Sequence, residues 1–269
     1  MPLGPLALHT WTLDTTPLDE TLAVVRRTGW DAIELRRVDF ARAAERGLAA
    51  DAVLERVRAS GLAVACVGVE LGWMFAEGEE RRRLLAAFEE SCRWAAALGT
   101  PRVMSPVDRG RGPVERAAAG VRDAGAIAQR HGVRLALEFN SQCEQFNTLA
   151  RIRELLALAR PPACGLLLDT YHLGRSGATL ADLEPVALEE IAYVQYSDVP
   201  ATGLVAGQAL DRLPPGRGSV PFRETFALLE RKGYRGPLSY EAPNPAAWAR
   251  PADEVAREAL EATRAVLPR

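Results

Sequence analysis

The sequence predicts one (β/α)8 barrel, a TIM barrel, as a single domain over residues 1–269. Strand-like and helix-like segments alternate along the whole chain, which is typical of a parallel sheet covered by helices. The length suits one such barrel, and no linker rich in Pro, Gly or Ser separates two halves. An open, doubly wound sheet is the alternative, but no glycine-rich phosphate-binding turn follows the first strand.

Eight short apolar segments, bounded by glycine, proline or polar residues, are predicted to be strands. In chain order they cover residues 6–9, 32–35, 63–69, 102–104, 133–138, 164–169, 191–196 and 238–241. The segment 164–169 contains an uninterrupted apolar run, Gly-Leu-Leu-Leu, directly before an aspartate. Such a run indicates a strand buried on both faces, as in a parallel sheet.

Helices are predicted after each strand from the spacing of apolar residues. They are expected at residues 17–28, 51–60, 77–98, 114–131, 148–159, 180–188, 222–231 and 251–266. Pro17 suits the first turn of its helix, and the pattern at 180–188 is the poorest of the set. The stretch 200–221 is the longest irregular one. Because it follows the seventh strand, it should lie on the face where barrels keep their active sites.

Four consecutive predicted strands end in a residue with a side-chain oxygen: Glu138, Asp169, Gln195 and Glu241. The carboxyl ends of barrel strands meet on one face, so we expect these side chains to converge. An unpaired buried carboxylate costs several kcal/mol by order of magnitude, and therefore needs a positive partner. For Asp169 alone, capping of the next helix is the simpler interpretation. Recurrence over four strands favours one divalent ion, Mn²⁺ or Mg²⁺, although Zn²⁺ or Co²⁺ could occupy such a site.

Composition excludes several other classes of partner. The net charge of −2 gives no electrostatic case for nucleic acid or an anionic membrane. No stretch approaches the length and hydrophobicity of a membrane span. The four cysteines are scattered without a CxxC pair, which indicates reduced thiols rather than a disulfide framework. We therefore expect a cytoplasmic protein with a small-molecule partner, and a homodimer or homotetramer is left open.

The motifs at the strand ends resemble the sugar phosphate isomerase/epimerase superfamily of xylose isomerase-like TIM barrels. The matching segments are Ala-Leu-Glu-Phe-Asn at 136–140, Leu-Asp-Thr-Tyr-His at 168–172, Val-Gln-Tyr-Ser-Asp-Val-Pro at 194–200, Pro-Gly-Arg-Gly at 215–218 and Tyr-Glu at 240–241. Gln195 is most similar to the residue of hydroxypyruvate isomerase relatives, whereas ketose 3-epimerases usually have histidine there. The alternation of strand-like and helix-like segments resembles the family over nearly the whole chain, but the specific motifs lie in its second half.

The resemblance implies a metal-dependent isomerase or epimerase that abstracts a proton next to a carbonyl in a small sugar, ketose or hydroxy-carbonyl compound. By resemblance, the four strand-end residues hold one divalent ion, and Glu138 and Glu241 also act as the acid and base groups. The physics agrees, because an ion beside the carbonyl stabilises the charge that proton removal creates. The resemblance further implies that Glu144, His172 and Arg212 contact the substrate.

Other activities share this scaffold, and the fold by itself does not choose among them. A metal-dependent dehydratase of the inosose or 3-dehydroshikimate type is the main alternative. A DNA-repair endonuclease is rejected, because it needs many histidines and the chain has three. A barrel whose site has decayed into a scaffold is disfavoured, because all four positions keep coordinating groups. His9 and Glu34 end the first two strands on the same face and are expected to line the pocket.

Overall fold

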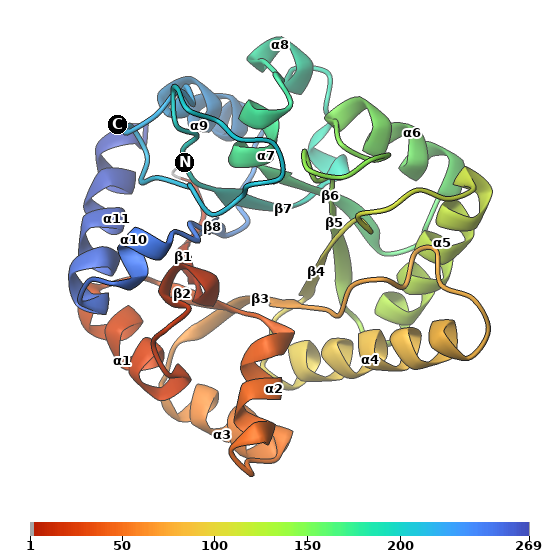
Figure 1. Ribbon diagram of the computed structural model, residues 1–269, viewed down its shortest axis with the longest axis horizontal. Coiled ribbons are helices and arrows are strands. Elements are labelled where there is room, and N and C mark those ends of the chain that lie inside the picture. The colour runs from red at the N-terminus through yellow and green to blue at the C-terminus, as the bar shows by residue number, and fades with distance from the viewer. Residues whose placement is uncertain (1–2, 269) are drawn as a thin grey trace.

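The computed structural model describes residues 3–268 and contains eight parallel strands that close into one barrel (Figure 1). The strands are β1 (Leu6–His9), β2 (Ala32–Leu35), β3 (Ala63–Gly68), β4 (Arg102–Pro106), β5 (Arg134–Glu138), β6 (Cys164–Asp169), β7 (Ile191–Tyr196) and β8 (Leu238–Tyr240). They pair in chain order, and β8 pairs with β1 to complete the ring. The predicted (β/α)8 barrel is confirmed.

Helices surround the barrel on its outside (Figure 1). The α-helices are α1 (Leu18–Thr28), α2 (Arg37–Glu45), α3 (Ala50–Ala59), α4 (Gly78–Ala97), α5 (Val114–Arg130), α6 (Leu149–Ala159), α7 (Thr170–Arg175), α8 (Leu180–Leu183), α9 (Phe222–Arg231), α10 (Pro245–Trp248) and α11 (Ala252–Val266). Two 3-10 helices, η1 (Thr10–Leu13) and η2 (Leu188–Glu190), complete the set. Of the residues described, no helix combines the length and the apolar character needed to cross a membrane.

Strand residues alternate between two apolar layers, because successive side chains of a strand point to opposite faces. The outward set, which includes Leu8, Ile33, Leu137 and Leu168, belongs to the large core beneath the helices. The inward set fills the barrel and consists of Ala7, Ala32, Ala65, Cys66, Met104, Ala136, Leu167, Ala192 and Tyr193. On a strand, the side chain two positions after an inward-facing residue also points inward, one layer nearer to the carboxyl end. The side chains that follow the apolar interior in this way form the mouth of the barrel.

Two of the unpredicted helices begin where an aspartate caps their first turn. In α7, Asp169 Oδ1 accepts the backbone N–H of Tyr171 at 2.9 Å. In α2, Asp39 Oδ2 accepts the backbone N–H of Arg36 at 2.7 Å. The prediction of one helix over 180–188 was wrong, because α8 covers four residues and η2 follows separately. Such short segments have too few apolar positions for a helical period to be visible.

The long loop between β7 and α9 is held against the barrel by Asp198. This buried side chain accepts the backbone N–H groups of Gly218 at 2.8 Å and Val220 at 2.9 Å. Its backbone also forms an antiparallel bridge with Leu213, with N–O distances of 2.8 and 3.1 Å. The predicted irregular stretch is thus confirmed as a loop, and its second half returns Arg212 to the end of the barrel.

We predict that Gly218→Ala destabilises the protein. A Cβ atom at this position would lie 2.0 Å from the carbonyl oxygen of Val199 and 2.7 Å from Oδ1 of Asp198. The loop would have to move, at an expected loss of about 1–3 kcal/mol in the free energy of unfolding. Urea unfolding measures this, with Gly110→Ala as control, because a Cβ at Gly110 meets nothing within 4 Å. Equal stability of the two variants would refute the prediction.

Candidate active site

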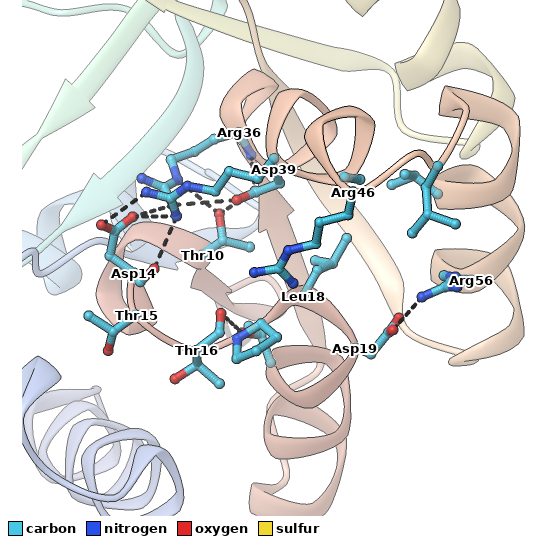
Figure 2. A pocket seen from close by; sticks show the side chains of 16 residues that line it. Thr10, Asp14, Thr15, Thr16, Leu18, Asp19, Arg36, Asp39, Arg46 and Arg56 are labelled. Atoms are coloured by element: carbon cyan, nitrogen blue, oxygen red, sulfur yellow. Dashed lines mark hydrogen bonds and ion pairs between the residues drawn. The ribbon is translucent and has the colours of Figure 1, made fainter.

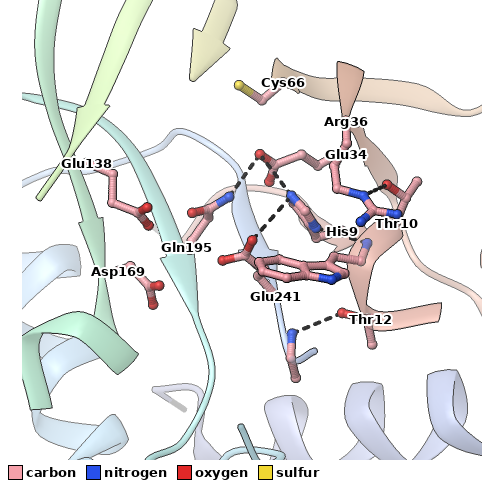
Figure 3. A network of polar contacts seen from close by, with 12 residues as sticks. His9, Thr10, Thr12, Glu34, Arg36, Cys66, Glu138, Asp169, Gln195 and Glu241 are labelled. Carbon is pink, nitrogen blue, oxygen red and sulfur yellow. Dashed lines mark hydrogen bonds and ion pairs between the residues drawn. The ribbon is translucent and has the colours of Figure 1, made fainter. Parts of the chain in front are cut away.

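The four predicted oxygen donors lie together at the carboxyl ends of the strands (Figure 3). Glu138 and Asp169 are the last residues of β5 and β6, Gln195 lies in β7, and Glu241 directly follows β8. All four are buried, with exposed fractions of 6% or less. The first three lie two positions after the inward-facing residues Ala136, Leu167 and Tyr193. The period of the strands therefore delivers them to the layer above the apolar interior.

Arg212 binds two of these carboxylates at once. Its Nη1 donates to Oδ2 of Asp169 at 2.8 Å and to Oε2 of Glu241 at 2.9 Å. The guanidinium lies 4.3 Å from the centre of the Tyr171 ring, and Arg212 is only 3% exposed. Of the two interpretations made for Asp169 from the sequence, the helix cap is observed, because Oδ1 caps α7, while Oδ2 accepts from Arg212. The prediction for Arg212 was a substrate contact, and the structure adds the carboxylate pair.

Two oxygens of the same group have no hydrogen-bond partner within residues 3–268. They are Oε1 of Glu138 and Oε1 of Gln195, and both are buried. A buried acceptor without a donor is unfavourable by about 1–3 kcal/mol. With Glu138, Asp169 and Glu241 ionised, Arg212 leaves two negative charges in the group. Unpartnered hard oxygens and a charge of this size fit a divalent cation.

His172 lies beside the same carboxylates. Its Nε2 is 3.8 Å from Oδ2 of Asp169 and 3.9 Å from Oε2 of Glu138. Glu138, Asp169 and His172 each offer one ligand atom, and these atoms lie within 4.8 Å of one another. Burial lowers the pKa of His172 to about 3, so the ring is neutral at pH 7. The residue predicted as a substrate contact is therefore also placed where a nitrogen ligand would be.

Burial raises the pKa of both proposed acid/base groups. For Glu138, burial is the largest cause and the negative charge of Asp169 adds to it, so its pKa lies well above the usual value. Burial also raises the pKa of Glu241, although Arg212 opposes the shift. Carboxyl groups with raised pKa values are typical of sites that transfer protons near neutral pH.

Two further buried residues, Glu34 and His9, belong to this network, and the sequence assigned them only to the pocket wall. Glu34 accepts Nε2 of Gln195 at 2.9 Å, and His9 Nε2 lies 3.5 Å from Oε1 of Glu241. Both lie two positions after inward-facing alanines, Ala32 and Ala7. The four oxygen donors were predicted from their positions at strand ends, and the two-residue period of the strands could have placed Glu34 and His9 in the same layer.

Glu144 is not brought into this cluster. It lies in the loop between β5 and α6, its side chain is exposed, and no ion pair joins it to another residue within 3–268. Its backbone N–H donates to the carbonyl of Arg109 at 3.1 Å. The structure therefore gives Glu144 no contact with the buried carboxylates.

A hollow lies outside the barrel mouth, against α1, α2 and α3 (Figure 2). Its arginines are paired with aspartates: Arg36 Nη2 lies 2.6 Å and Arg42 Nη1 3.0 Å from Oδ1 of Asp14. Arg56 is likewise paired with Asp19. Because these charges neutralise one another, the hollow has less potential to attract an anion than its arginines suggest.

Comparisons with known proteins agree with this architecture. The family model described as "Xylose isomerase-like TIM barrel" matches residues 22–266. Inosose isomerase of Halalkalibacterium halodurans is 24% identical over 262 residues, which are 94% of this chain and 92% of that protein. The 3-dehydroshikimate dehydratase of Pseudomonas aeruginosa is 32% identical over 158 residues, which are 56% of this chain but 22% of the dehydratase.

Among solved structures, the IolI protein with a bound zinc atom superposes with a TM-score of 0.86. It is 20% identical in sequence, and the alignment covers 97% of each chain. At this level of identity the likeness supports the fold and leaves the activity to the side chains of the site.

We predict that Arg212→Met destabilises the metal-free protein, and more at pH 8 than at pH 5. Removing one partner of a buried ion pair costs about 3–5 kcal/mol. At lower pH the carboxyls left behind take up protons, and neutral carboxyls need no counter-charge. Urea unfolding at both pH values measures the difference, with the exposed Arg217→Met in the same loop as control. A loss independent of pH would argue against the charge pairing.

Proposed function

Since the chain belongs to the xylose isomerase-like TIM barrel family, we propose that it is a metal-dependent isomerase or epimerase of a small polyhydroxylated ketone. The relatives support an enzyme of the isomerase/epimerase kind, and the full-length match to an inosose isomerase makes cyclic or linear ketoses the first substrates to consider. The metal dependence and the roles of individual residues are our proposal.

One observation carries the proposal: the carboxyl ends of four neighbouring strands carry buried oxygen donors, two of which have unpartnered oxygens. Glu138, Asp169, Gln195 and Glu241 would hold the ion, with His172 as an additional nitrogen donor within reach. Oxygen donors favour Mn²⁺ or Mg²⁺, and a zinc atom, as in the IolI protein, or Co²⁺ would also suit the set.

In the reaction we propose, the two glutamates act as proton acceptor and proton donor. When bound, a divalent ion would act as a Lewis acid that stabilises negative charge on the substrate's carbonyl oxygen. One of Glu138 and Glu241 takes the proton from the neighbouring carbon, and the other returns a proton to complete epimerisation. They come from β5 and β8, on different sides of the mouth (Figure 3).

Substrate hydroxyls would be bound by the neutral His172 ring and by Arg212. In the structure Arg212 is engaged by Asp169 and Glu241. A divalent cation on those carboxylates would weaken that attraction and free the guanidinium for a substrate oxygen. Glu144 would join these contacts only if the loop between β5 and α6 closed over the mouth.

A dehydratase is the second candidate, because a stretch of 158 residues is 32% identical to a 3-dehydroshikimate dehydratase. The same proton abstraction would be followed by loss of a hydroxyl group. Incubation with ketoses, inososes and hydroxypyruvate in D₂O with Mn²⁺ separates the two. Deuterium on the carbon next to the carbonyl without loss of water supports the isomerase, loss of water supports the dehydratase, and neither reaction with any compound counts against both.

We predict that Asp169→Ala and Asp169→Asn both lose Mn²⁺ binding. Alanine removes the ligand and the helix cap together. Asparagine keeps an oxygen for the Tyr171 N–H, and its NH₂ group, which is a donor only, then takes the place of Oδ2, so this variant isolates the effect on the ion. Calorimetric titration with Mn²⁺ measures affinity, and Asp182→Ala, which removes an exposed cap from α8, is the control. Undiminished affinity in both Asp169 variants would contradict the proposed site.

We predict that Glu138→Gln and Glu241→Gln retain part of the metal affinity but lose about 10²–10⁴-fold in turnover. Glutamine keeps an oxygen ligand and cannot accept a proton. The two single variants should differ in the reaction they still catalyse. One of them can still exchange the substrate proton on one face of the carbon without inverting its configuration. Turnover and hydrogen exchange in D₂O measure this, with the exposed Glu115→Gln as control. Exchange that survives unchanged in the double variant would leave both glutamates as ligands only.

A further inference from the structure

We propose that Glu34 is a positioning residue that orients the amide of Gln195, so that the amide oxygen faces the ligand carboxylates. This inference rests on the proposed function, because it concerns how one metal ligand is presented. Glu34 lies on β2, across the barrel from Gln195 on β7, and 161 residues separate the two in sequence. Figure 3 shows the hydrogen bond that joins them.

A glutamine ligand has an ambiguity that a carboxylate lacks. Its oxygen can bind a cation, whereas its NH₂ group is a donor only, and the two ends have nearly the same shape. In the structure Nε2 of Gln195 donates to Oε1 of Glu34 at 2.9 Å, and Oε1 of Gln195 has no partner within residues 3–268. Rotating the amide by 180° would place its oxygen against Oε1 of Glu34, acceptor against acceptor when Glu34 is ionised, and burial raises the pKa of Glu34 to about 8. Glu34 therefore selects the orientation that leaves the oxygen available.

Glu34 can do this because its own position is restrained. It is fully buried, and its second oxygen, Oε2, accepts the hydroxyl of Tyr193 at 3.0 Å. On the other side, His9 Nε2 lies 3.8 Å from Oε1. Nδ1 of His9 accepts the backbone N–H of Trp11 at 3.1 Å, and Nε2 lies closer to Oε1 of Glu241, at 3.5 Å, than to Glu34. The hydroxyl of Tyr193 therefore restrains one oxygen of Glu34 and leaves the other to accept the amide of Gln195.

The arrangement follows a general rule for metal sites. A histidine ligand usually donates its second ring N–H to a carboxylate, which fixes the direction of the ligand atom. Here a carboxylate supports an amide in the same way. It follows that Glu34 would also support a histidine at position 195, with one ring nitrogen donating to Glu34 and the other facing the ion.

The experiment is a double-mutant cycle read by Mn²⁺ titration calorimetry on the wild-type chain, Glu34→Leu, Gln195→Leu and the double variant. Leucine at 34 removes the acceptor, and we expect affinity to fall about 10–100-fold, as is usual for residues that support a metal ligand. In the Gln195→Leu background the same change should have no further effect, because Glu34 acts through Gln195. Equal losses in both backgrounds, or no loss in either, would overturn the proposal.

Three further variants keep the test sound if Glu34→Leu folds poorly. Glu34→Gln still offers an oxygen to Gln195, so it should lose less affinity than Glu34→Leu. Tyr193→Phe removes the hydrogen bond that restrains Glu34 but keeps the acceptor for Gln195, so it should weaken affinity, and by less than Glu34→Leu. Gln195→His should bind Mn²⁺ or Zn²⁺ with Glu34 present and weakly without it. A Gln195→His variant indifferent to Glu34 would overturn the proposal.

The controls separate this inference from the proposed function. If the wild-type chain binds no divalent ion, the metal site itself is wrong, and the role of Glu34 is wrong with it. If the wild-type chain binds Mn²⁺ and Glu34→Leu binds it equally well, only the role of Glu34 is wrong. Circular dichroism melting curves confirm that each variant is folded before titration.

Discussion

The structure of the barrel mouth depends on the need to neutralise buried carboxylates. Glu138, Asp169 and Glu241 are all removed from water, and ionised groups in such surroundings are tolerated only with positive partners. Arg212 supplies one such charge through short contacts to Asp169 and Glu241. Burial, to which the negative charge of Asp169 adds, still raises the pKa values of Glu138 and Glu241. A divalent cation and partial protonation are alternative solutions to the same electrostatic problem.

Arg212 can neutralise these carboxylates only if the loop between β7 and α9 holds it in place. The residue lies on an irregular loop, where a long side chain would normally be mobile and exposed. Asp198 prevents this by accepting backbone N–H groups from the turn at Gly218, and the bridge to Leu213 fixes the residue next to Arg212. The ring of Tyr171, from α7, packs against the guanidinium. The loop and helix that follow the strands thus position a charge that the strands require.

Much of the fold was predictable because it depends on local patterns. The alternation of apolar strands and amphipathic helices predicted the barrel, and the polar residue at the end of each strand predicted Glu138, Asp169, Gln195 and Glu241. The short helix α7 escaped prediction because six residues carry too little periodicity. The pairing of Arg212 with Asp169 and Glu241 and the bond between Glu34 and Gln195 join residues that are 29 to 161 positions apart. One sequence contains no signal for which of its many arginines or glutamates forms such a contact.

The polar groups at the strand ends do not surround the mouth evenly, and this asymmetry has a chemical meaning. Strands β5 to β8 supply the oxygen donors, and β1 and β2 supply His9 and Glu34, which orient or approach them. In contrast, β3 ends in Gly68 and β4 in Pro106, neither of which has a polar side chain. In the function proposed above, a polyhydroxylated ketone would present its oxygens to the cation site. Its carbon face would then lie toward β3 and β4, whose last residues offer no polar side chain.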